Sequence, residues 1–96
     1  MDEAKIASKI VADYGDVEIF INTFDVFDTN VRDLGPHSLG NVRRDLTPAA
    51  MEMLKGKVLK AALMATRNLK NDVISILRRD VELTEDMQDL GIQFKR

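Results

Sequence analysis

Apolar residues near the start of the chain are spaced as on one face of a helix. Ile6, Ile10 and Tyr14 recur every four positions within DEAKIASKIVADY, and that interval returns a side chain to the same helical face. Asp2 and Glu3 precede this face, where acidic side chains stabilise the positive end of the helix dipole. The pattern therefore predicts a first helix that ends near Tyr14.

The segment after Gly15 combines a helical period with residues that favour strands. Gly15 can adopt the left-handed conformation that ends a helix, and Asp16 can cap the next one. Apolar residues then recur at intervals of three and four: Val17, Phe20, Ile21, Phe24, Phe27, Val31 and Leu34. This period predicts a second helix from 17 to 34, closed by Gly35 and Pro36. Because β-branched residues alternate at its start, the segment could also contain strand.

The longest helical pattern begins at Thr47 and Pro48. A threonine cap followed by proline at the first helical position is a start signal, and the pattern predicts a helix from 48 to 80. Gly56 costs this helix up to about 1 kcal/mol but does not end it. The apolar positions share one broad side: Met51, Leu54, Val58, Ala62, Ala65, Leu69, Val73, Ile76 and Leu77.

A further start and stop pattern lies near the end of the chain. Thr84 is expected to cap a short last helix, and Gly91 is expected to end it. Ile92 and Phe94 follow in a tail that could dock on an apolar surface. The sequence thus predicts one more helix and a C-terminal segment that packs against the rest.

Together these patterns predict an all-α fold in which 1–96 form a single small domain. It has two N-terminal helices, a long helix over 48–80 and a short C-terminal helix. At a rise of 1.5 Å per residue the long helix would measure about 50 Å, whereas a domain of this size has a radius of only about 13 Å. We therefore expect a second subunit to bury part of its apolar side, which makes the chain a homo-oligomer.

Composition excludes several classes of protein. Hydrophobic residues make up 45% of the chain, which is typical of globular rather than disordered proteins. No apolar run reaches the ~18 residues that a membrane span needs, and the first residues lack the apolar core of a secretory signal. Without cysteine there is neither a disulfide framework nor a thiolate metal site. A cytoplasmic location is the expectation.

Charge is distributed unevenly along the chain. The net charge is −2, yet residues 41–80 hold nine basic and four acidic side chains, a balance of +5, against −5 for residues 1–40. On the predicted helix the basic residues lie apart from the apolar side. The candidate binding surface, here called the basic stripe, consists of Arg43, Arg44, Lys57, Lys60, Arg67, Lys70, Asn71 and Arg78, with Arg79 and Asn68 beside them.

The sequence is compatible with three kinds of anionic partner for the basic stripe. It is also compatible with a stripe that is only a solvated polar face and binds no partner. An acidic protein surface is the first prediction. Nucleic acid is the second, since arginine contacts phosphates and asparagine can contact bases, although a pI of about 5.3 is low for a nucleic-acid binder. A small phosphorylated ligand or nucleotide, sequestered between subunits, is the third.

No catalytic or metal-binding motif is complete. Gly35 and Gly40 have the spacing of a phosphate-binding loop, but Asn41 and Val42 replace its lysine and hydroxyl residue. His37 is the only histidine, so the common zinc sites cannot form. We therefore expect no cofactor, no metal and no enzymatic activity. The sequence favours a small non-enzymatic adaptor or inhibitor-type protein that binds another macromolecule.

Overall fold

The computed structural model describes residues 2–29 and 46–94. Within these ranges the elements follow in the order α1 (Glu3–Tyr14), α2 (Val17–Asn22), β1 (Phe27–Thr29), α3 (Pro48–Leu63), α4 (Leu69–Arg79), α5 (Val81–Asp89) and β2 (Ile92–Phe94). The strands have three residues each, and helices make up most of the rest. The predicted all-α class is confirmed.

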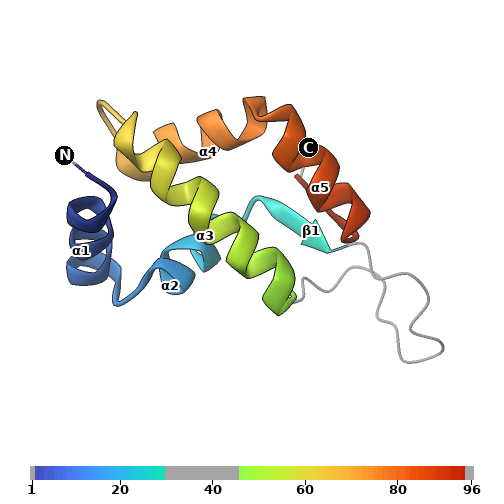
Figure 1. Cartoon of the computed structure of the whole chain (residues 1–96), viewed down its shortest axis with the longest axis horizontal. Helices are drawn as coiled ribbons and strands as arrows, with labels where there is room; N and C mark the ends of the chain where they lie inside the picture. Colours follow the sequence, from blue (N-terminus) through green and yellow to red (C-terminus); the bar gives the residue numbers. More distant parts are fainter. Residues whose placement is uncertain (1, 30–45, 95–96) are drawn as a thin grey trace.

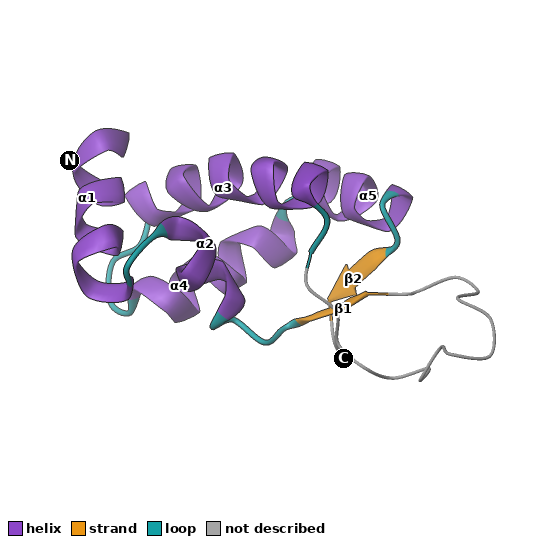
Figure 2. Ribbon diagram, turned by 90° about the horizontal axis from the view of Figure 1, so that it is seen from below, coloured by secondary structure: helices purple, strands orange, loops and turns teal. Residues whose placement is uncertain are grey.

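Helix α3 is the element around which the others pack. It contacts α1, α2 and α4, while α5 contacts α4 and β2. Figures 1 and 2 show α1 at one end of the elongated molecule, and α5 with the β1–β2 pair toward the other. The two strands are antiparallel, and Phe27 lies opposite Phe94 in their register. This pairing joins the early part of the chain to its C-terminal segment.

The buried side chains form one apolar cluster. Phe20 and Ile21 are completely buried in it. The rings of Phe20 and Phe24 form a T-shaped contact, with their centroids 4.9 Å apart. No polar or charged side chain is buried among the described residues. The largest fully buried members are Phe20, Phe27, Ile10, Ile21, Leu54, Leu77, Leu83, Met87, Ile92, Val58 and Val73. Burial of apolar surface is therefore the main stabilising force in this fold.

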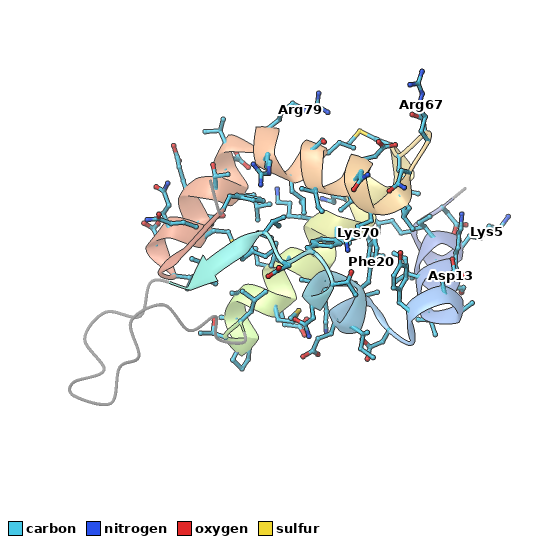
Figure 3. The ribbon with its side chains drawn as sticks, turned by 180° about the vertical axis from the view of Figure 1, so that it is seen from behind. Lys5, Asp13, Phe20, Arg67, Lys70 and Arg79 are labelled. Carbon is cyan, nitrogen blue, oxygen red and sulfur yellow. The ribbon has the colours of Figure 1, made fainter. Side chains whose placement is uncertain are left out.

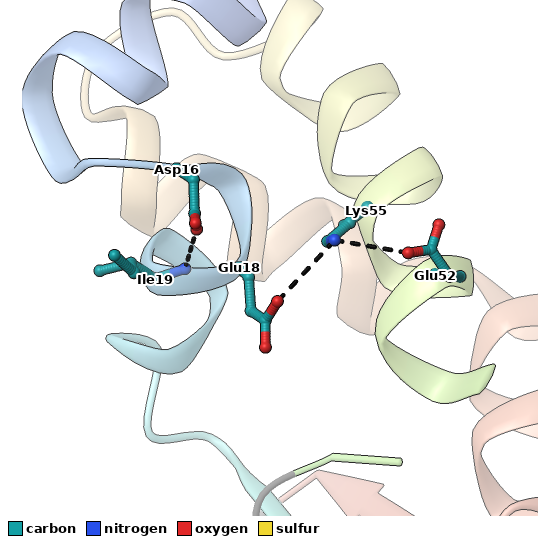
Figure 4. A network of polar contacts seen from close by, with 5 residues as sticks. All are labelled: Asp16, Glu18, Ile19, Glu52 and Lys55. Atoms are coloured by element: carbon teal, nitrogen blue, oxygen red, sulfur yellow. Dashed lines mark hydrogen bonds and ion pairs between the residues drawn. The ribbon is translucent and has the colours of Figure 1, made fainter. Parts of the chain in front are cut away.

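Two of the predicted helix starts, at Asp16 and Thr47, are confirmed by their hydrogen bonds. Asp16 Oδ1 accepts a hydrogen bond from the Ile19 N–H at 2.7 Å (Figure 4), and Gly15 before it has φ 107°. Thr47 Oγ1 accepts from the Ala50 N–H at 3.2 Å, directly before Pro48. In each case a side-chain oxygen satisfies an N–H that has no partner within the helix.

The single helix predicted over 48–80 is wrong: α3 ends at Leu63 and α4 begins at Leu69. Asn68 caps α4, because its Oδ1 accepts from the Asn71 N–H at 2.9 Å. Short polar side chains compete in this way with the backbone hydrogen bonds of a continuous helix. The chain turns between the two helices, so α4 folds back against α3.

This turn also removes the reason for expecting a second subunit on the apolar side. Met51, Leu54 and Val58 of α3 and Val73 and Leu77 of α4 are all buried within one chain. No 50 Å helix remains whose surface would need another copy to cover it. Self-association through this side is therefore not supported, and the oligomeric state stays a prediction.

The second predicted helix, over 17–34, is also shorter than expected. Helix α2 ends at Asn22, and the Thr23 hydroxyl donates to the Phe20 carbonyl at 2.6 Å. Asp25 has φ 48°, a left-handed conformation that an α-helix cannot contain. The chain then enters β1 at 27–29. The alternating residues at the start of the segment, which suggested strand, lie in helix α2 instead. Its predicted end at Leu34, Gly35 and Pro36 lies outside the described residues.

The last helix begins four residues earlier than the sequence suggested. Asp80, not Thr84, caps α5, since its Oδ1 accepts from the Leu83 N–H at 2.9 Å. Gly91, at φ 79°, follows the helix end as predicted. Ile92 is buried and Phe94 packs against the core, which confirms that the C-terminal segment docks on an apolar surface.

Candidate binding surface on helix α4

The turn at 64–68 divides the basic stripe. Lys57 faces the start of α5, where its Nζ lies 3.4 Å from Asp80 Oδ2 and both side chains are about two-thirds buried, with 31% and 29% exposed. Lys60 is exposed on α3, and Lys70 is half-buried on α4. Arg43 and Arg44 lie outside the described residues. The predicted set therefore does not form one continuous surface.

What remains together is the outer face of α4 and the turn before it. Its exposed members recur at helical spacing, and they are called here the α4 face: Arg67, Asn68, Asn71, Ser75, Arg78 and Arg79. The carboxylate of Asp72 lies between Asn68 and Ser75, where it accepts hydrogen bonds from the turn. Figure 3 shows Arg67 and Arg79 projecting away from the body of the molecule near the two ends of α4. The α4 face is thus a polar, positively charged strip.

Arg78 is held in place by an aromatic ring. Its guanidinium carbon lies 5.3 Å from the centroid of Phe94, a distance suited to a cation–π interaction. The Phe94 ring in turn packs against the Phe27 ring, with their centroids 4.8 Å apart. The β1–β2 pair therefore positions an arginine at the C-terminal end of the α4 face.

Asp72 fixes the turn at the other end. Its Oδ2 accepts hydrogen bonds from the backbone N–H groups of Thr66 and Arg67, both at 2.9 Å, and of Asn68 at 3.3 Å. The bonds from Arg67 and Thr66 favour the ionised carboxylate and lower the pKa of Asp72. Sequence reasoning missed this residue, although an asparagine cap followed by an acidic residue in the first turn is a recognisable helix-start signal. Asp72 orders the backbone that carries Arg67 and Asn68.

Asp72→Ala is expected to lower the melting temperature, because three N–H groups lose their common acceptor. Since the folded-state pKa is lowered, ionised Asp72 stabilises the fold above its ordinary pKa, and this contribution disappears as pH falls through the lowered value. The difference in melting temperature between wild type and variant should therefore be constant near neutral pH and shrink in acid. Ser75→Ala, one turn further along α4, is the control. A difference that does not depend on pH would contradict this role of the carboxylate.

Two open hollows flank the α4 face. One of about 220 Å³ lies beside Arg67, and apolar side chains of three helices contribute to it: Ile6, Ala62, Leu63 and Leu69. The other, of about 350 Å³, lies beside Arg78 and is lined in part by Met87, Ile92 and Phe94. Each end of the α4 face therefore combines an arginine with a partly apolar depression.

The side of the molecule next to α4 is acidic. Helix α5 follows α4 directly and carries four carboxylates: Glu82, Glu85, Asp86 and Asp89. A long, strongly anionic partner on α4 would pass near this helix and be repelled. The positive strip is limited to about one helix in length.

Neither a metal centre nor a membrane span is found in the described part of the chain. Within 2–29 and 46–94 no group of three or more His, Asp or Glu side chains could hold a metal ion. No helix in these ranges is both long enough and apolar enough to cross a membrane. His37 and the segment resembling a phosphate loop lie outside them.

Among the described residues, the α4 face is the candidate binding surface. Comparison of the chain with protein-family models, curated proteins and solved structures found no match.

Proposed function

We propose that the protein is a non-enzymatic binding module whose α4 face docks on an acidic surface of another protein. The observation that carries the proposal is the pairing of an exposed arginine with a partly apolar hollow at each end of α4. Binding energy in protein interfaces is concentrated in arginine and aromatic residues at pockets of this kind. The module would act as an adaptor or as an inhibitor, according to what its partner does.

The chemistry of the α4 face fits carboxylates. Arg67 and Arg79 are exposed, and a guanidinium can donate two parallel hydrogen bonds to one carboxylate. Asn71 and Ser75 between them add neutral polar groups. A partner segment with acidic residues and apolar side chains near its ends would match both the charge and the two hollows.

Nucleic acid is the second candidate. Asn68 and Asn71 share the α4 face with three arginines, and asparagine side chains can contact base edges. The acidic α5 and a pI of about 5.3 count against it, because phosphate backbones extend well beyond one helix and dominate such affinities. The protein partner is therefore preferred.

Arg67→Glu and Arg79→Glu are each expected to weaken partner binding at least tenfold, which is about 1.4 kcal/mol, while changing stability by no more than ~0.5 kcal/mol. The partner is first captured from the native host with wild-type protein and then purified, and its affinity for each variant is measured by calorimetry. Lys5→Glu on α1 makes the same change in net charge away from the α4 face. It should alter affinity less than about threefold, since long-range charge mainly affects association rate.

A parallel titration with random-sequence duplex DNA separates the two candidates. The protein-binding function predicts little or no binding to DNA at physiological salt. Binding that falls steeply with salt and is abolished by both arginine reversals would replace it with nucleic-acid recognition. A partner whose affinity responds equally to Lys5→Glu and Arg79→Glu would show that the α4 face is not the binding site.

A further inference from the structure

The two hollows beside the α4 face differ in the apolar surface that they leave exposed. The hollow beside Arg67 is also lined by Lys9 of α1 and Leu63 of α3, and it is called here the α1 hollow. Leu63 is 40% exposed, whereas Met87 and Ile92 in the other hollow are each only 1% exposed. The apolar contribution to binding is proportional to the apolar surface that is removed from water. The α1 hollow therefore has more to gain from an apolar ligand group.

The α1 hollow also has two cationic side chains from separate elements. Lys9 lies on α1 and Arg67 in the turn before α4, and both are exposed. Figure 1 shows this turn at the same end of the molecule as α1. Within residues 2–29 and 46–94 neither side chain forms an ion pair, and no carboxylate is among the residues that line the hollow. In the other hollow the one charged lining residue of the described chain is Arg78, whose guanidinium already lies over the Phe94 ring.

A carboxylate in the α1 hollow would be bound by side chains and not by the backbone. Asp72 already accepts the N–H groups of the turn, from Thr66, Arg67 and Asn68, so these donors are not available to a second anion. An arginine donates up to two parallel hydrogen bonds to one carboxylate, and a lysine ammonium adds a separate point charge. Because Lys9 and Arg67 stand on different elements, they suit two carboxylates that flank an apolar group.

The size of the α1 hollow limits what it can hold. Its volume of about 220 Å³ lies below the roughly 300–1,000 Å³ of pockets that take drug-sized ligands. It is large enough for one apolar side chain, and Leu63 and Leu69 contribute apolar walls. A single side chain of a partner protein fits these dimensions better than a separate small molecule.

We propose that the α1 hollow anchors the partner by taking one large apolar side chain from an acidic segment, while Lys9 and Arg67 bind carboxylates on either side of it. This inference rests on the proposed function and makes it more specific. It adds α1 to the interface and identifies Lys9, which is not part of the α4 face, as a residue that determines specificity. The α1 hollow is expected to contribute more to binding than the hollow beside Arg78.

A capped peptide with one leucine between two pairs of glutamates is the probe. Its binding to isotope-labelled protein is followed by backbone amide chemical shifts, and we expect a dissociation constant on the order of 1 mM for so short a ligand. The signals of Leu63 and Leu69 should move, whereas those of Thr84 and Gln88 in the other hollow should not. Exchange of the leucine for glycine, or of all four glutamates for glutamine, should weaken binding at least fivefold. A glycine peptide that binds as tightly as the leucine peptide would overturn the proposal, because charge alone would then account for binding.

Lys9→Glu and Lys5→Glu form a matched pair, since the two lysines are one turn apart on α1 and both are exposed. Of the two, Lys9 lines the hollow, and Figure 3 shows Lys5 pointing away from the body of the molecule. Lys9→Glu should weaken binding of the probe at least fivefold and of the native partner at least tenfold, and Lys5→Glu should change either by less than about threefold. Both variants should shift the melting temperature by no more than about 3 °C, so a loss of binding would not reflect a loss of fold.

Leu63→Gln and Leu90→Gln test the apolar part of the site. Both leucines are 40% exposed, but Leu90 follows α5 and lines neither hollow. Leu63→Gln should weaken binding of the probe at least threefold, and Leu90→Gln should leave it unchanged. Equal effects of the two variants would contradict an anchoring role for the α1 hollow.

The proposed function and the anchor site can fail separately. A native partner whose affinity falls with Arg79→Glu, but responds alike to Lys9→Glu and Lys5→Glu, would support the α4 face and overturn the α1 hollow as its anchor. A native partner that responds to neither Arg67→Glu nor Arg79→Glu would refute the proposed function. Loss of probe binding on Lys9→Glu would in that case still support the α1 hollow as a site for acidic segments.

Discussion

Phe20→Ala is expected to reduce the free energy of unfolding by about 3–5 kcal/mol, the range for removing a buried phenylalanine ring. Phe20 has no exposed surface, and its ring lies 4.6 Å from Tyr14 and 4.9 Å from Phe24, centroid to centroid. The variant loses both aromatic contacts and leaves a cavity where α1, α2 and α3 meet. Because small domains are stable by only about 5–15 kcal/mol, part of the population should be unfolded at room temperature. Urea unfolding followed by circular dichroism measures the change.

Ile19→Ala provides the matched control for Phe20→Ala. Ile19 is the neighbouring residue in α2, and 47% of it is exposed, so its truncation should cost less than about 0.5 kcal/mol. A loss below about 1 kcal/mol for Phe20→Ala would mean that the ring is not buried as described. Equal losses for both variants would contradict the helical phase of α2.

The starts of α2 and α3 were predictable because the signals for them are local. Asp16 and the Thr47–Pro48 pair each act within one turn of their own position, through a hydrogen bond to an N–H three residues later. Such bonds depend on a short stretch of sequence and not on the rest of the fold. The apolar period was equally informative, since Phe20, Phe24 and Phe27 are all buried.

The break at 64–68 was not predictable from the apolar period. The period continues from Leu54 to Leu77 because residues on both sides of the turn face the same core. Two helices joined by a tight turn therefore give the same apolar period in this sequence as one straight helix. What separates them is Asn68 and Asp72, whose side chains bind the N–H groups of the turn, and polar residues of this type also occur on exposed helix faces.

The strand at 27–29 depends on a partner distant in the chain. Phe27 pairs with Phe94 across the β1–β2 ladder, and no local signal specifies that contact. The left-handed backbone at Asp25, which separates α2 from β1, is also unusual for a residue other than glycine. The apolar period of this segment predicted a helix, but the pairing of β1 with β2 determines its structure instead.

The candidate surface was predicted in part. Arg67, Asn71 and Arg78 were identified from their helical spacing, and all three are exposed on the α4 face. Lys57 was included because its spacing fits a continuous helix, but the turn directs it to Asp80 instead. The hollows beside Arg67 and Arg78 combine residues from separate elements, so only the folded chain reveals them.

Ile92→Asp is expected to destabilise the fold by about 3–5 kcal/mol, the cost of leaving a charge buried without a partner. Ile92 is only 1% exposed, and no polar or charged side chain is buried among the residues that the structure describes. The introduced carboxyl group would have to remain protonated or force β2 away from the core. Loss of β2 would also release Phe94 from Phe27 and Arg78. Urea unfolding at pH 7 measures the loss.

Gln93→Asp separates this effect from a simple change of charge. Gln93 is adjacent to Ile92 in β2 but exposed, because successive residues of a strand point to opposite faces. Its replacement should cost less than about 1 kcal/mol, reflecting mainly the poor strand propensity of aspartate. Since burial raises the pKa of a carboxyl group and the protonated form costs less to bury, the destabilisation by Ile92→Asp should shrink as pH falls from 7 toward about 4, the ordinary pKa of aspartate, whereas that by Gln93→Asp should hardly change. Similar losses for the two variants at pH 7 would show that the C-terminal segment does not dock through Ile92, and that Arg78 lacks the support of Phe94 on which its position in the α4 face depends.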